Sequence, residues 1–420
     1  MSRPTSTQAD DSGPADPEAE AVSVVMPVRN EERHLEESVY SVLGQDYEGG
    51  LEVVLAVGPS RDRTLQVSQR LAAADSRVTL VPNPTGRIAC GLNAAIKASR
   101  HSVLARVDGH ALLPQGYLST AVRALRQTGA DNVGGIMAAE GVTPFQQAVA
   151  WAMTSPFGVG AARFHTGGQS GPADSVYLGV YRRAAIERVG GYDVSYLRAE
   201  DWELNHRIRL AGGLIWFLPE LRVSYRPRAT VRTLAAQYFG YGRWRRVVSR
   251  QHAGTINLRY LAPPAAVLAM AAGTLIGLIG IVGLSVGSGW TWAALATGLA
   301  LPAAYLAGVL AVAVAAARLL RPRAVAWLPL ALATIHICWG IGFLTSPRRL
   351  IPGTAPPTHP PAPPSPSAHD HEELSSPLGA AAESATGPPA PPDLGLAGCS
   401  EFVWLARRVP GGGKHRRERA

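Results

Sequence analysis

Two groups of carboxylates in this sequence stand where they could do chemistry. Asp108 follows the largely apolar run 103–107 and precedes Gly109 and His110. In an open α/β sheet, ligands bind beyond the carboxyl ends of the strands. A carboxylate placed there can hold a divalent cation, and the cation can hold a diphosphate. The alternative is a strand that ends in an ordinary Asp-Gly turn.

His110 is a second candidate metal ligand. Imidazole ligates Mn²⁺ but is a poor ligand for Mg²⁺, which prefers oxygen. His110 could instead contact a sugar or hydrogen-bond to the turn.

The second group is Glu200 and Asp201, which open a helical pattern with Leu204 and Ile208 on its apolar side. The helix dipole favours ionised carboxylates at that end. Such a carboxylate could accept a proton, or it could only cap the helix. Trp202 fits a core position better than a stacking platform.

The elements that must position these residues alternate between strands and helices. Apolar, β-branched runs at 21–27, 51–57, 78–81 and 103–107 are separated by amphipathic helical patterns, and further strands are predicted at 132–137, 176–181 and 215–218. This alternation predicts a mostly parallel sheet flanked by helices. Asn30 is expected to cap the first helix, with Glu31 in its first turn. The glycine-rich segment 157–172 is expected to be a mobile loop over the site.

The last third of the chain has a different composition. The stretches 263–285, 290–316 and 324–344 lack charged residues and reach the ~20 residues that span a bilayer. A buried, soluble helical domain is the alternative. Residues 1–20 and 351–420 are expected to be a disordered leader and a disordered Pro-rich tail with a basic end. The expected division is therefore 1–20, 21–250, 251–350 with about three membrane helices, and 351–420.

Charge predicts the surroundings of the chain. The net charge is +9, yet charged residues make up only 17% of the chain, and arginines gather before the first apolar stretch. This favours a membrane protein over a nucleic-acid binder, with the part before the spans in the cytoplasm. Arg348 and Arg349 follow the third stretch, so that stretch is either re-entrant or breaks the positive-inside rule.

Four ordered motifs, at 25–32, 60–64, 106–110 and 200–204, together resemble the family 2 glycosyltransferases, which have the GT-A (Rossmann-like) fold. The ExoA-type succinoglycan glucosyltransferases are the most similar branch. They share a Gly-Gly-Tyr-Asp turn before the Glu-Asp pair, a Pro-Arg dipeptide, here 227–228, and a Gln-Tyr-Phe-x-Tyr-Gly-Arg run, here 237–243. The resemblance covers about residues 21–250.

The resemblance implies roles for individual residues. Asp108, with His110 as a second candidate ligand, would bind the Mg²⁺ or Mn²⁺ that bridges the donor diphosphate. Asp201 would be the catalytic base with Glu200 beside it. The acceptor side or the leaving diphosphate would contact Gln237, Arg243 and Trp244. Donor binding would involve Pro27, Asn30, Glu31, Asp62, Arg87 and Asp108.

Simpler alternatives stay open for several of these residues. Glu31 could only complement a helix dipole, and Asp62 could only form an Asx-turn. Gln237, Arg243 and Trp244 could simply pack at the membrane interface. This chain also departs from the family pattern. Val57 stands where many relatives have a nucleotide-binding Asp, which weakens the prediction of uridine recognition, and His110 stands where relatives often have a second Asp.

The resemblance implies a membrane-anchored, inverting glycosyltransferase. It would move a sugar from a nucleotide-diphosphate donor, expected to be a UDP-hexose, to a lipid-linked saccharide in exopolysaccharide or cell-envelope glycan synthesis. The expected location is the inner cell membrane, with several spans and a cytoplasmic catalytic domain. The alternatives are a polyprenyl-phosphate sugar synthase, whose acceptor phosphate needs no base, and a non-catalytic scaffold that retains the fold.

Overall fold

The computed structural model describes residues 20–284 and 290–351. Apart from Glu20 and Ile351, the leader and the Pro-rich tail predicted from the sequence lie outside the described residues.

One mixed sheet is the frame of the α/β part. Its strands run in the order β3-β2-β1-β4-β7-β5-β8-β6. Pairing is parallel between β1 and β2, β1 and β4, β2 and β3, and β5 and β8, whereas β7 runs antiparallel to β4 and β5, and β6 antiparallel to β8. The predicted, mostly parallel sheet is confirmed. Its strands are β1 (Val22–Val28), β2 (Leu51–Val57), β3 (Val78–Pro82), β4 (Val103–Arg106), β5 (Asn132–Ala139), β6 (Gly171–Pro172), β7 (Tyr177–Arg182) and β8 (Ile215–Tyr225).

Helices cover both faces of this sheet because successive strand residues point to opposite sides. Along β1, Val24 and Met26 belong to the core under α1, α2 and α4, while Val25 belongs to the core under α3, α8 and α9. The helices of the first face are α1 (Leu35–Leu43), α2 (Thr64–Ala74) and α4 (Tyr117–Thr128). Those of the second face are α3 (Ile88–Ala98), α8 (Arg183–Arg188) and α9 (Glu200–Leu210).

Two local predictions are wrong. Asn30 does not cap α1, which begins at Leu35 after His34; Asn30 instead adopts a left-handed conformation with φ of 58°. The glycine-rich segment forms α6 (Pro156–Val159), α7 (Arg163–Thr166) and the edge strand β6 instead of one irregular loop. Proline at the start of α6 and the hydroxyl of Ser155, which accepts from the Phe157 amide, start the first of these turns.

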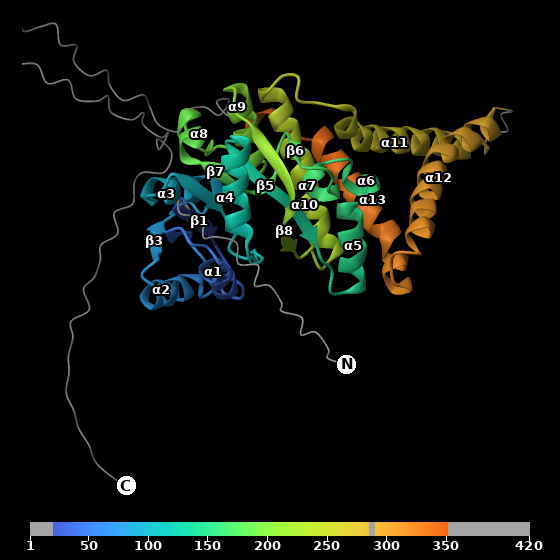
Figure 1. Cartoon of the computed structure of the whole chain (residues 1–420). Coiled ribbons are helices and arrows are strands. Elements are labelled where there is room, and N and C mark those ends of the chain that lie inside the picture. Colours follow the sequence, from blue (N-terminus) through green and yellow to red (C-terminus); the bar gives the residue numbers. More distant parts are fainter. Residues whose placement is uncertain (1–19, 285–289, 352–420) are drawn as a thin grey trace, which may run out of the picture.

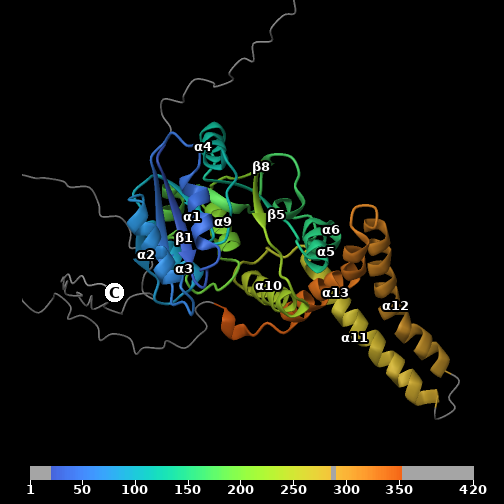
Figure 2. The ribbon, with the colours of Figure 1, turned by 90° about the horizontal axis from the view of Figure 1, so that it is seen from below.

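Among the described residues, three helices are long and apolar enough to cross a membrane: α11 (Leu258–Leu284), α12 (Thr291–Ala316) and α13 (Pro322–Leu344). Figures 1 and 2 show α11 and α12 extending away from the sheet as a pair, while α13 returns to it. In the apolar 18-residue segment of α13, 39% of the residues are buried, against 17% in the corresponding segments of α11 and α12. The short 3₁₀ helix Arg348–Leu350 follows α13.

Helix α13 packs along α10 (Val231–Gln251) and against α5 (Pro144–Thr154). Glycines let the backbones of α10 and α13 approach closely. A Cβ added at Gly342 would lie 2.1 Å from the Phe239 carbonyl oxygen, and one added at Gly242 would lie 2.0 Å from that of Trp339. The helices α11, α12 and α13, here called the membrane-type helices, are therefore joined to the α/β part through α13.

Candidate active site

The centre of the candidate site is Arg106, the last residue of β4. Its side chain is only 6% exposed and lies among three carboxylates. Its Nε and Nη2 atoms lie 3.3 and 3.2 Å from Asp108 Oδ1, and Nη2 also lies 3.2 Å from Glu200 Oε1. Nη1 contacts Asp201 Oδ1. The structure thus brings together Asp108 and the Glu200-Asp201 pair and places a cation between them.

Two separate segments of the chain supply these carboxylates. Asp108 follows β4 directly, while Glu200 and Asp201 form the first turn of α9, after Ala199 in a left-handed conformation with φ of 64°. Burial acts to lower the pKa of the Arg106 guanidinium, but Asp108 and Glu200 outweigh it and raise that pKa above its ordinary value. Arg106 therefore stays charged.

Arg106 belongs to the motif at 106–110, but the sequence analysis predicts no role for it. The signal was present: a charged residue inside an otherwise apolar strand is seldom buried without a partner.

His110 and Glu31 form a second pair in this region. The His110 Nδ1 atom lies 2.9 Å from Glu31 Oε1. The hydrogen bond to the Glu31 carboxylate raises the pKa of His110, burial opposes it, and the charge of Asp108 adds to the rise. Glu31 precedes α1, whose acidic first turn consists of Glu36 and Glu37, and its carbonyl oxygen accepts from the Leu35 amide at the start of that helix.

The chemistry of Asp108 and His110 fits a divalent ion whose remaining ligands come from a diphosphate and water. The described residues contain no group of three or more His, Cys, Asp or Glu side chains that could hold a metal by themselves. The Asp108 side chain is 24% exposed and accepts the two Arg106 hydrogen bonds at Oδ1. His110 pairs with Glu31 through Nδ1, the arrangement in which the other ring nitrogen of a histidine commonly binds metal.

The loops after β1 and β2 are tied together beside this centre. Asp62 accepts hydrogen bonds from the Thr64 amide and hydroxyl at Oδ1 and from the Glu32 amide at Oδ2. Asn30 accepts one from the Arg61 amide. Asp62 therefore forms the Asx-turn left open as an alternative, and it also clamps the two loops.

The two other predicted donor residues lie near the end of β1 and directly before α3. Pro27 is in β1 beyond Val25, the last residue that pairs with β4, so its missing amide costs no ladder bond there. Arg87 precedes α3, and its side chain is exposed.

The three predicted residues on α10 have different surroundings. Gln237 is buried, and its Nε2 donates to the hydroxyls of Tyr225 and Tyr241 at 3.0 and 2.8 Å. Burial raises the pKa of Tyr177, and the charges of Asp108 and Tyr225 add to the rise. Tyr177 therefore interacts electrostatically with both Asp108 and Tyr225. Trp244 packs in a small core against Tyr196, and Arg243 lies over the Phe239 ring. The packing alternative thus describes Trp244 and Arg243 better than Gln237.

This fold and this site define a class of protein. A mixed sheet with two carboxylate groups gathered at the end of a central strand is the architecture of GT-A glycosyltransferases. The model of the family described as "Glycosyl transferase family 2" matches residues 23–190. The chain belongs to the family 2 glycosyltransferases.

Individual relatives agree with this assignment. The chain is 34% identical over 258 residues to "Succinoglycan biosynthesis protein ExoA" of Rhizobium meliloti, covering 61% of this chain and 78% of the relative. It is 22% identical to the "Dolichyl N-acetyl-alpha-D-glucosaminyl phosphate 3-beta-D-2,3-diacetamido-2,3-dideoxy-beta-D-glucuronosyltransferase" of Methanococcus voltae, covering 58% and 77%.

A solved structure shares the fold. The mannosyltransferase PcManGT of Pyrobaculum calidifontis, in complex with GDP-Man and Mn²⁺, superposes with a TM-score of 0.50 at 20% identity. The match covers 80% of this chain and 90% of the mannosyltransferase.

Proposed function

We propose that this protein is a membrane-anchored, inverting glycosyltransferase that moves a sugar from a nucleotide-diphosphate donor to a lipid-linked saccharide. Residues 21–250 would form its catalytic domain and 251–350 its membrane region, at the inner membrane with the catalytic domain in the cytoplasm. The gathering of Asp108, Glu200 and Asp201 around buried Arg106 carries the proposal. Relatives named for succinoglycan biosynthesis and for transfer to a dolichyl-linked sugar phosphate support the acceptor class and a role in polysaccharide synthesis.

Asp201 is the better candidate for the base. Its side chain is 37% exposed, whereas that of Glu200 is 8% exposed, so an acceptor hydroxyl can reach Asp201 more easily. The acceptor oxygen bonds to the anomeric carbon, its proton passes to the Asp201 carboxylate, and the bond to the diphosphate breaks with its electron pair on the leaving oxygen. One displacement inverts the anomeric configuration.

Asp108, with His110 beside it, would hold a Mg²⁺ or Mn²⁺ ion, which when bound neutralises charge on the leaving diphosphate. The bound Mn²⁺ of the mannosyltransferase of the same fold supports this assignment. Loops around Asn30, Glu31, Asp62 and Arg87 would enclose the nucleotide.

The test is the Asp201→Asn variant. Asparagine keeps the size of the side chain and loses its basicity, so we expect normal membrane yield, near-normal donor binding and at least ~10²-fold slower transfer of labelled sugar into the lipid extract. The exposed Asp46→Asn variant is the control and should match the parent. Transfer by Asp201→Asn at the parent rate would favour a polyprenyl-phosphate acceptor, because a phosphate needs no base.

A second test removes the metal. A chelator should abolish transfer, added Mn²⁺ or Mg²⁺ should restore it, and Asp108→Ala should lose donor binding as well as turnover. Donor binding unchanged in Asp108→Ala would exclude the metal role. A parent protein that neither transfers nor hydrolyses any nucleotide sugar would favour the scaffold alternative.

A further inference from the structure

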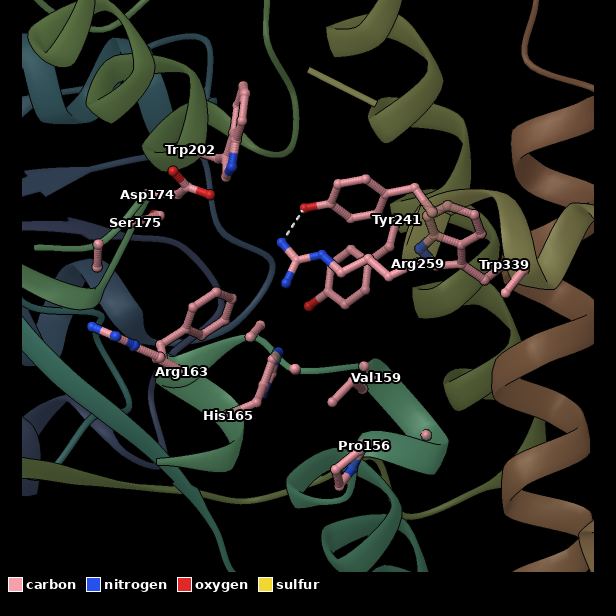
Figure 3. A pocket seen from close by; sticks show the side chains of 18 of the residues that line it. Pro156, Val159, Arg163, His165, Asp174, Ser175, Trp202, Tyr241, Arg259 and Trp339 are labelled. Atoms are coloured by element: carbon pink, nitrogen blue, oxygen red, sulfur yellow. Dashed lines mark hydrogen bonds between the residues drawn. The ribbon is translucent and has the colours of Figure 1, made fainter. Parts of the chain in front are cut away.

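A cavity of about 870 Å³ lies where the α/β part meets the membrane-type helices. Residues of the α6–α7 segment, α9, α10, α11 and α13 line it. In Figure 3, Trp202 and Asp174 lie across the cavity from Tyr241, Arg259 and Trp339. Arg106, Asp108 and Asp201 do not line it, but Trp202, the neighbour of Asp201, does. The cavity therefore lies beside the proposed base and outside the donor site.

Arg259, in the first turn of α11, is the main polar group of this cavity. Figure 3 shows its guanidinium reaching into the cavity from the side of the membrane-type helices. Nη2 donates to the Tyr260 hydroxyl at 2.6 Å, while Nε is buried without a hydrogen-bond partner. Within residues 20–284 and 290–351, no carboxylate pairs with Arg259. A partly buried cation that lacks a counter-ion favours an anion at this position.

The surroundings add positive charge. Arg163 and Arg209 also line the cavity, and Asp174, the one carboxylate among the described residues that line it, lies 2.9 Å from Arg209. Arg245 stacks on the Tyr260 ring at 3.9 Å, and Arg259 lies 4.6 Å from the centre of the same ring. The cavity therefore has an excess of positive charge.

His165 adds no charge to this set at neutral pH. It lines the cavity, and its Nδ1 is buried without a hydrogen-bond partner. Burial, assisted by Arg259, lowers its pKa to about 4. A neutral imidazole can donate one hydrogen bond to an anion.

The remaining wall is apolar and continues onto the lipid-facing helices. Pro263 and Ala266 of α11 and Ile335 and Trp339 of α13 line it. Further along α11, Leu268 and other large apolar side chains are exposed. A ligand that fits both walls carries an anion at one end and a hydrocarbon chain at the other.

We propose that this cavity binds the phosphate of the acceptor lipid, a phosphate or diphosphate ester of a long apolar alcohol. Arg259 binds the phosphate, and the hydrocarbon chain runs between α11 and α13 towards the bilayer. The saccharide end then lies on the side of Trp202, next to Asp201. This inference rests on the proposed function for its acceptor, but lipid binding can be measured without any transfer.

The experiment measures binding of labelled farnesyl phosphate to the full-length protein in neutral detergent. The parent and Asp201→Asn should bind alike, because Asp201 is outside the cavity. Arg259→Met should bind about tenfold more weakly or worse, since a charge-assisted contact is lost. Arg259→Lys should recover part of the affinity, and the exposed Arg232→Met on α10 is the control.

A second pair of variants protects the test against misfolding of Arg259→Met. Ala266→Glu places a negative charge in the cavity and should weaken binding, whereas Ala266→Gln should not. Equal binding by Arg259→Met and the parent, or no binding of farnesyl phosphate by the parent, would overturn the proposal and leave the transferase assignment intact.

Competition identifies the ligand. Unlabelled farnesyl phosphate should displace the label at far lower concentration than farnesol, inorganic phosphate or phosphatidylglycerol. Competition by farnesol at equal concentration would refute the role of the phosphate. Equal competition by inorganic phosphate would refute the role of the chain, and equal competition by phosphatidylglycerol would indicate a general lipid site instead of an acceptor site.

Discussion

Arg106 carries its charge to a buried position at the end of β4, where Asp108, Glu200 and Asp201 surround it. Three carboxylates around one guanidinium give an excess of negative charge. This excess would suit the proposed binding of a divalent ion. The same residue holds α9 against β4, because its guanidinium bridges residues 94 positions apart. Site geometry and local stability therefore depend on one side chain.

Replacing Arg106 by Met should destabilise the α/β part by ~3–5 kcal/mol, because buried Glu200 loses its partner. The midpoint of denaturant unfolding of the purified protein measures this. The matched control is Arg70→Met, which removes an exposed pair with Glu36 and should cost at most ~1 kcal/mol. Equal midpoints for the two variants would show that the Arg106 cluster does not hold the fold.

Asp62 gives a prediction with a defined pH dependence. Burial alone would raise its pKa, but hydrogen bonds from Thr64 and the Glu32 amide lower it. A depressed pKa means that the stabilisation is present above the ordinary carboxyl range and is lost as pH falls through the folded-state pKa. Asp62→Ala should thus cost ~1 kcal/mol at neutral pH, and the difference from the parent should shrink in acid. Unfolding curves at several pH values would show a constant difference if Asp62 acted without its charge.

At the scale of elements, the crossing of α10 and α13 decides how the α/β part meets the three apolar helices. Gly242 and Gly342 remove the side chains that would separate these helices. The contact also supports one wall of the cavity, because Tyr238 and Tyr241 on α10 and Trp339 on α13 all line it.

A large side chain at the crossing should separate the two helices. Gly342→Leu would place Cβ 2.1 Å from the Phe239 carbonyl oxygen, so we expect a lower melting temperature and faster proteolysis near residue 345. Gly308→Leu in α12 is the control, since a Cβ there meets nothing within 4 Å. Similar proteolysis of both variants would show that the crossing does not join the two parts.

At the scale of the whole molecule, the protein combines an α/β part with a pair of helices, α11 and α12, whose outer surface is apolar. Large hydrophobic side chains along α11 and α12 are exposed, among them Leu275 and Leu301. Such a surface is stable in a bilayer and costly in water. The expressed protein should therefore fractionate with membranes and resist alkaline extraction. Recovery in the soluble fraction without detergent would contradict this arrangement.

The sequence by itself determined the class of fold and the composition of the membrane region. Strand and helix periodicities are local, so β1 to β4 and the helices between them could be located from apolar spacing. The predicted strand at 215–218 proved to be the start of the longer β8. Helices α4 and α5 were missed because the pattern after Asp108 is less regular. Asp108, Glu200 and Asp201 could be selected because their motifs stand at the ends of such elements.

Only the tertiary structure decided which side chains meet. The pairing of His110 with Glu31 joins residues 79 positions apart, and Arg106 reaches Glu200 across 94. These contacts depend on the order of strands in the sheet, including the insertion of antiparallel β7 between β4 and β5. The cavity at Arg259 depends on how α11 and α13 pack against the α6–α7 segment. Local periodicity encodes neither arrangement, because strand order and helix docking arise from burial summed over the whole chain.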